Sequence, residues 1–358
     1  MTGSHTPDVA EGAMGHGYAR HSRVQHSAAD HGMPLLDRAL DAVVLPRDGS
    51  PFRVADLGAA AGTNSLGPLH AVVERVRART AARTPVTVVH TDIPANDFNA
   101  LFDTLTGSPD SYVRDPDVYA CAQARSFYEP LFPTAELHLA WSAIAVHWLS
   151  RVPGPVLGHV FSSRATGAAR EALRQQSRKD WEAFLTHRAR ELRSGGQLVV
   201  LGGASADDGT SGAEGLMDAA DAVLGDLARE GLITTAEHAR MTIPTWNRTA
   251  EEFLAPLGTE PLAEVLRLEE HELVALPDPH LERYEETGDA SAFAEGVTQF
   301  FRAAIEPSLF SALDPERSDA EVSAAAGAFA EGLRARAAAD PEALETHWHV
   351  LMLRVTRR

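Results

Sequence analysis

An apolar run that leads directly into a glycine-bearing turn limits the fold more than any other feature of this sequence. Residues 52–58 read FRVADLG, which predicts a buried strand that ends in a turn. A helical pattern follows at 66–78, and a second apolar run follows at 85–90. Strands that alternate with helices in this way favour a parallel sheet with right-handed crossover connections.

The rest of the chain continues this pattern. Further strands are expected at 137–143, 197–201, 265–276 and 347–356, and further helices at 33–44, 181–192 and 216–231. We therefore predict an α/β protein with a Rossmann-like, mainly parallel seven-stranded sheet, a reversed last hairpin and an α-helical cap. Residues 1–203 and 262–358 are assigned to the core and 204–261 to the cap.

Composition excludes several classes of function. The 358 residues carry a net charge of -18, which argues against nucleic-acid binding because phosphates need basic partners. No apolar stretch is long enough to span a bilayer, and the N-terminus lacks the apolar region of a secretory signal. The single cysteine, Cys121, precludes an intrachain disulfide and favours a reducing compartment. We expect a cytoplasmic protein without membrane contact.

Acidic side chains at two consecutive strand ends indicate a ligand site. Asp56 precedes a turn that holds Gly58 and Gly62, a spacing that lacks the third glycine of a dinucleotide site. The carboxylate of Asp56 suits a cationic ligand such as a sulfonium amino acid. Asp92 follows the next strand and can accept hydrogen bonds from both hydroxyls of a ribose. Taken alone, Asp56 and Gly58 could also belong to an ordinary strand–helix turn.

Six sequence blocks in the same order give the chain a specific resemblance. They are YARHSRVQ at 18–25, ADLG at 55–58 with GTN at 62–64, TDIPANDFN at 91–99, RSFY at 125–128 with LFP at 131–133, WS at 141–142 with HWLSRVP at 147–153, and SGG at 194–196 followed by EGLI at 230–233. With these blocks the chain resembles the SABATH family of methyltransferases, named for its salicylate, benzoate and theobromine enzymes. The resemblance implies the class I methyltransferase fold, S-adenosylmethionine as the methyl donor, S-adenosylhomocysteine as the product, and a homodimer.

The resemblance also implies roles for individual residues. Positions around the cofactor are matched by Tyr18, Ser22, Asp56, Gly58, Asn64, Asp92, Ile93, Ser126, Phe127 and Ser142. Positions around the substrate are matched by Tyr18, Gln25, His147, Trp148, Met217, Trp246 and Phe301. Among these, Gln25 and Trp148 match the donors that hold the substrate carboxylate. We therefore expect methyl transfer to a carboxylate oxygen of a small organic acid, expected to be aromatic, with formation of a methyl ester.

The chemistry agrees with neutral donors at these two positions. A carboxylate is already ionised at neutral pH and needs no general base, so the enzyme has to align and desolvate two reactants. The amide of Gln25 and the indole of Trp148 donate hydrogen bonds without carrying charge. Each also has an ordinary interpretation, Gln25 as a surface residue and Trp148 as a core residue. Trp246 could likewise serve only to join the cap to the core.

Three alternatives remain open at this point. The acceptor could be a nitrogen or a hydroxyl, in which case His147 would matter as a base, or the chain could be a non-catalytic relative. His147 could also be a buried structural histidine. The family's Asn-Lys-Gly block, which lies near a metal in some members, is replaced here by LGHV at 157–160, and the 16 histidines are not clustered. We therefore expect no metal.

Overall fold

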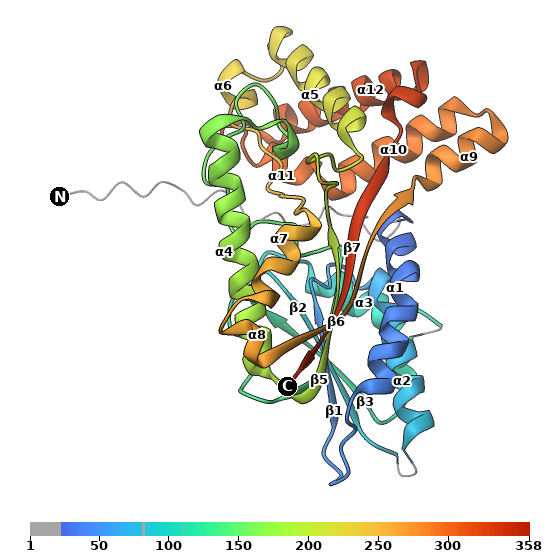
Figure 1. Cartoon of the computed structure of the whole chain (residues 1–358). Helices are drawn as coiled ribbons and strands as arrows, with labels where there is room; N and C mark the ends of the chain where they lie inside the picture. Colours follow the sequence, from blue (N-terminus) through green and yellow to red (C-terminus); the bar gives the residue numbers. More distant parts are fainter. Residues whose placement is uncertain (1–22, 81–82, 110) are drawn as a thin grey trace.

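A seven-stranded sheet forms the centre of the protein (Figure 1). The structure is a computed structural model that describes residues 23–80, 83–109 and 111–358, with the backbone alone at 23–27 and 277. The strand order is β3-β2-β1-β4-β5-β7-β6. The strands are β1 (Phe52–Leu57), β2 (Val86–Asp92), β3 (Val118–Ala124), β4 (Leu137–Ala143), β5 (Leu192–Gly203), β6 (Leu266–Pro277) and β7 (His347–Arg357).

The pairing directions confirm the predicted topology. Strands β1 to β5 pair in parallel, whereas β7 runs antiparallel to both β5 and β6. The strand that sequence reasoning missed is β3, which lies at the edge of the sheet and is buried only at its first residue, Val118. A half-exposed edge strand lacks the apolar run that marks the central strands.

Helices cover both faces of the sheet (Figure 1). One face packs against α1 (Arg23–Ala42), α2 (Leu66–Arg79) and α3 (Phe98–Gly107), and the other packs against α4 (Gly167–Glu191), α7 (Ala250–Leu254) and α8 (Leu262–Val265). Successive strand residues alternate between the two cores, so that Val199 and Leu201 join the first while Leu198 and Val200 join the second.

A third hydrophobic core holds together a helical layer beyond the carboxyl ends of the parallel strands (Figure 1). Its helices are α5 (Glu214–Arg229), α6 (Thr235–His238), α9 (Pro279–Thr287), α10 (Ala290–Ala304), α11 (Glu306–Phe310) and α12 (Asp319–Ala339). The helices that pack together therefore extend well beyond the predicted cap at 204–261, because α5 packs against α12, which in turn packs against α10. The division into a core and a cap stays a prediction. No helix in the described part of the chain is long and apolar enough to cross a membrane.

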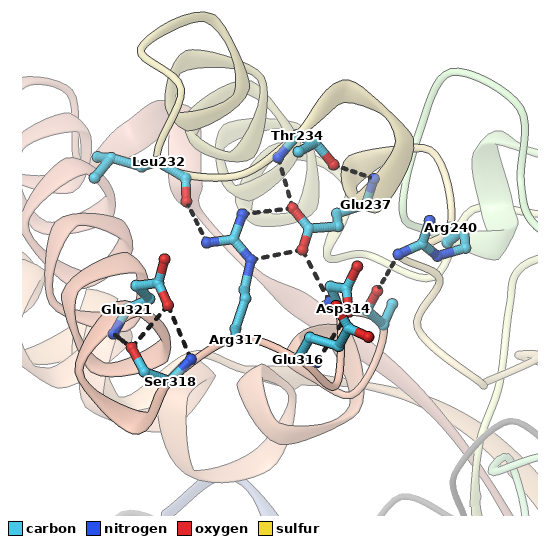
Figure 2. A network of polar contacts seen from close by, with 10 residues as sticks. Leu232, Thr234, Glu237, Arg240, Asp314, Glu316, Arg317, Ser318 and Glu321 are labelled. Carbon is cyan, nitrogen blue, oxygen red and sulfur yellow. Dashed lines mark hydrogen bonds and ion pairs between the residues drawn. The ribbon is translucent and has the colours of Figure 1, made fainter.

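A partly buried ion pair joins two segments of this helical layer (Figure 2). Arg317 donates from Nε to Glu237 Oε1 at 2.6 Å and from Nη2 to Oε2 at 2.7 Å, and its third nitrogen donates to the carbonyl of Leu232. Glu237 also accepts from the backbone of Thr234 and Asp314. The guanidinium of Arg317 holds the pKa of Glu237 well below its usual range. This contact fixes α6 against the turn that precedes α12.

Candidate active site

Neighbouring strand ends open into a cavity of about 1190 Å³ that reaches solvent. Asp56 lies opposite His90 on β2 and opposite Trp141 on β4, so the parallel register brings the ends of three strands together. The cavity is lined by seven of the residues predicted for the cofactor: Asp56, Gly58, Asn64, Asp92, Ile93, Ser126 and Phe127. Two others, Tyr18 and Ser22, lie outside the described residues.

The carboxylate of Asp92 lies at the end of β2 and faces this cavity. One of its oxygens accepts from the backbone N–H of Ala60 at 2.7 Å, and the other accepts from that of Ile93 at 2.8 Å. Burial raises the pKa of Asp92 to about 6, against the opposing effect of these two hydrogen bonds. Each oxygen retains a further lone pair, so the carboxylate can still accept two hydroxyl groups.

Gly58 shapes the turn between β1 and the cavity. Its φ of 85° is unfavourable for any other residue, and a Cβ atom would lie 2.5 Å from the Cβ of Ala145. The backbone N–H groups of Gly58 and Ala59 both donate to the carbonyl of Thr91, at 2.9 and 3.1 Å. The turn is thus tied to the end of β2, close to Asp92.

A buried network behind the cavity holds Asp56 in place. The hydroxyl of Ser65 donates to Asp56 Oδ2 at 2.6 Å, and His90 Nδ1 lies 2.8 Å from the same oxygen. The other ring nitrogen of His90 contacts the hydroxyl of Tyr112. Sequence reasoning missed His90 and Tyr112, although a histidine inside an apolar strand was the available signal. The network fixes the direction in which Asp56 presents its carboxylate.

Ser142 does not line the cavity, and its role as a cofactor residue stays a prediction. Its side chain is fully buried, and its hydroxyl donates to the carbonyl of Leu57 at 2.9 Å. The neighbouring residues Trp141 and Ala143 line the cavity instead. Successive side chains of a strand point to opposite faces, so one position along β4 decides which residues face the ligand.

A second cavity of about 710 Å³ adjoins the first. Ile144 and Trp148 line both, which places Trp148 at their boundary. The walls of the second cavity are largely apolar and come from distant segments: Phe161, Met217, Ile243, Phe300, Ile305 and Trp348. Its polar side chains are His147, Thr245, Asn247 and His349. Of the predicted substrate residues, it brings together His147, Trp148 and Met217.

Hydrogen bonds on two sides hold the segment that carries His147 and Trp148. Trp148 bridges to Thr245, and the carbonyl of His147 accepts from the backbone of Trp246 at 2.9 Å. From the other side, the hydroxyl of Tyr128 lies 2.9 Å from the carbonyl oxygen of Val146 and 2.6 Å from that of Trp148. The hydroxyl has one proton and donates to one of them at a time. Trp148 is therefore fixed at the boundary by its backbone.

Phe301 and Trp246 do not line the second cavity, and their roles as substrate residues stay predictions. Phe301 is fully buried and packs against Phe329, with ring centroids 5.3 Å apart. Each residue turns a helix by about 100°, so Phe300 lines the cavity while Phe301 points into the helical core. The indole of Trp246 donates to Glu252 at 3.0 Å, and its ring lies 5.3 Å from the guanidinium of Arg170.

Gln25 lies in the first turn of α1, and its side chain lies outside the described part. Ala28, three residues later on the same helix, lines the second cavity. The predicted contact of Gln25 with the substrate carboxylate stays a prediction. Among the described residues, no three histidine, cysteine or acidic side chains form a group that could hold a metal ion.

Comparisons with known proteins agree with this geometry. A family model described as SAM dependent carboxyl methyltransferase matches residues 5–348. Gibberellic acid methyltransferase 2 of Arabidopsis thaliana is 30% identical over 329 residues, which cover 84% of this chain and 83% of that protein. Indole-3-acetate O-methyltransferase 1 of Oryza sativa subsp. japonica is 32% identical over 282 residues, which cover 68% of this chain and 69% of that protein.

A solved structure supports the fold assignment. The structure of loganic acid methyltransferase with SAH aligns with a TM-score of 0.77 at 21% identity and covers 98% of this chain and 99% of that one. At this identity the likeness shows a shared fold. Together with the family match over almost the whole sequence, it shows that the chain belongs to the SABATH family of S-adenosylmethionine-dependent carboxyl methyltransferases.

Proposed function

We propose that the protein methylates a carboxylate oxygen of a small aromatic acid across the boundary between its two cavities. S-adenosylmethionine supplies the methyl group, and the products are the methyl ester and S-adenosylhomocysteine. The observation that carries the proposal is the position of Trp148, which lines both the cavity with the strand-end carboxylates and the apolar cavity beside it. An acid in the second cavity can thus place its carboxylate against the indole and toward the first.

The residues of the first cavity fit the cofactor. Asp92 keeps a lone pair on each oxygen for the two ribose hydroxyls, and Asp56 offers a second carboxylate for the cationic amino-acid end. Ile93 and Phe127 provide apolar surface for an adenine ring. Two carboxylates that accept hydrogen bonds, together with apolar walls, match a cationic nucleoside and do not match an anionic dinucleotide.

The residues of the second cavity fit an acid that is already ionised. Aromatic side chains of Trp148, Phe161, Phe300 and Trp348 line its walls, which supports an aromatic acceptor. The indole of Trp148 and the amide of Gln25 would hold the carboxylate by neutral hydrogen bonds, which leaves its nucleophilicity intact. Apolar walls keep water away from the reacting oxygen.

His147 is poorly suited to act as a base. Burial lowers its pKa to about 3, and the positive charge of Arg248 contributes to this lowering. An imidazole with such a pKa accepts protons weakly at neutral pH, so removal of a proton from a hydroxyl or amine acceptor gains little. This property supports the carboxylate as the acceptor over the two alternatives.

Turnover of labelled S-adenosylmethionine with a panel of small aromatic acids tests the proposal. Because misplacement by an ångström costs on the order of a hundredfold in rate, Gln25→Ala and Trp148→Phe should each lower kcat/KM strongly, with cofactor affinity unchanged. Trp246→Phe is the matched control, since that indole lies outside both cavities. An unchanged kcat/KM in Trp148→Phe would refute the role of the indole.

We further propose that the protein is a homodimer in the cytoplasm. The resemblance to the SABATH family supports the dimer. The single cysteine, Cys121, which cannot form an intrachain disulfide, supports a reducing compartment.

A further inference from the structure

Two histidines of the second cavity each keep a buried ring nitrogen without a partner. Nδ1 of His147 and Nδ1 of His349 are shielded from solvent and form no hydrogen bond among the described residues. Both residues line the same cavity. Buried polar groups in folded proteins nearly always have a partner, so two cavity-lining histidines with unpaired nitrogens mark this wall as one that a ligand can complete by hydrogen bonds to their rings.

The surrounding backbone keeps these side chains in place. A Cβ at Gly203 would lie 2.9 Å from His147 Nδ1 and 3.0 Å from Asn247 Oδ1, so the absence of a side chain at Gly203 leaves room for both polar groups. His349 is fixed on β7, where its N–H donates to Ser211 at 3.0 Å and its carbonyl accepts from Ala204 at 2.8 Å. The polar atoms are therefore held on rigid elements of the cavity wall.

The charge of the cavity restricts what these atoms can bind. Among the described residues that line it there is no lysine, arginine, aspartate or glutamate. The lowered pKa of His147 keeps its imidazole neutral, so the ring both donates and accepts hydrogen bonds. A second carboxylate or an ammonium group would enter this space without an opposite charge, which is unfavourable.

We infer that the acid acceptor carries an uncharged hydrogen-bonding group, a hydroxyl in the simplest case, in addition to its carboxylate, and that His147, Asn247 and His349 bind it. This inference rests on the proposed function and adds a substrate class to it. The two ends of the acid then have separate binding sites. Trp148 holds the reacting carboxylate, and the histidine pair with Asn247 selects the substituent.

Matched pairs of acids test the inference. The probes are phenylacetic acid and phenylpropanoic acid, each beside its meta- and para-hydroxy derivatives, assayed with labelled S-adenosylmethionine. A hydrogen bond of ordinary strength predicts that at least one hydroxylated acid exceeds its parent in kcat/KM by about tenfold. His349→Leu and His147→Leu should reduce that ratio to near one, mainly through a loss on the hydroxylated acid.

His271→Leu is the matched control, because His271 is an exposed histidine on β6 outside the cavity, and its ratio should equal that of the wild type. His349→Gln keeps a polar group and should recover part of the preference, which a merely structural histidine would not show. If the parent acids have the same kcat/KM as every hydroxylated acid, the inference is wrong while the proposed function stands. The same holds if His349→Leu lowers kcat/KM equally for the parent and the hydroxylated acids. If no acid is methylated, the proposed function fails and the inference fails with it.

Discussion

Replacement of Asp92 by asparagine should stabilise the ligand-free protein and weaken cofactor binding at the same time. The pKa of Asp92 rises from 3.8 to about 6 in the folded chain, mainly because the carboxylate is buried. At about 1.36 kcal/mol for each pKa unit, this rise corresponds to about 3 kcal/mol by which the ionised group opposes folding. The fold therefore carries a costly anion at the place where a ribose would be held.

The sign of the effect follows from the direction of the shift. Below about pH 4 Asp92 is protonated in the folded and the unfolded chain alike, so it does not oppose folding. As the pH rises, the unfolded chain loses this proton first, and the free energy of unfolding falls until the pH has passed the folded pKa of about 6. The Asp92→Asn substitution removes this loss but turns an amide NH₂ toward one of the two backbone N–H groups, at a cost of about 1 kcal/mol. At pH 8 the variant should therefore be more stable than the wild type by about 2 kcal/mol.

Calorimetry with and without S-adenosylhomocysteine measures both consequences. For a chain of 358 residues, about 2 kcal/mol corresponds to a rise of about 3 °C in Tm. This gap should close as the pH falls from 6 toward 4. The loss of charge-assisted hydrogen bonds should weaken S-adenosylhomocysteine binding by about tenfold to a hundredfold, or about 1.4 to 2.7 kcal/mol, so that saturating ligand removes most or all of the stability advantage of the variant. A ligand-free Asp92→Asn protein less stable than wild type at pH 8 would refute the argument from burial, and unchanged affinity would refute the role in ribose binding.

Three further outcomes are expected. With saturating substrates, kcat should stay flat from about pH 6.5 upward, because the acid is already ionised and the pKa of His147 is only about 3. A rise in kcat near pH 6.5 that disappears in His147→Ala would show that His147 acts as a base. Arg317→Ala should lower the free energy of unfolding, measured in urea, by about 3 kcal/mol because Glu237 stays buried without its partner. The same change at the exposed Arg240 should lower it by only about 0.5 kcal/mol, and equal losses would contradict the prediction. Light scattering should give the mass of a dimer, and a monomer mass across micromolar concentrations would exclude the homodimer.

Most of the sheet and the cavity at its strand ends could be predicted from sequence because their signals are local. Asp56, Gly58 and Asp92 each follow an apolar run directly, and parallel pairing brings the ends of such runs to one edge. The first part of α4, up to Asp180, lacked such a signal. There Gln176 and Asp180 are buried although they are polar, since they bond to each other and Asp180 bonds to Ser150, so no apolar stripe marks the helix.

The second cavity could not be predicted in the same way, because its walls come from segments far apart in the chain. Phe301 shows the limit, since family likeness locates α10 but the packing of α10 against α12 and α9 decides that Phe300 faces the cavity. His349 carries no local motif at all, and only the pairing of β7 beside Gly203 brings it to the cavity of Trp148. The two halves of the site therefore respond differently to sequence change. Substitutions at His349 or Asn247 can change which acid is accepted while the cofactor motifs at the strand ends stay intact.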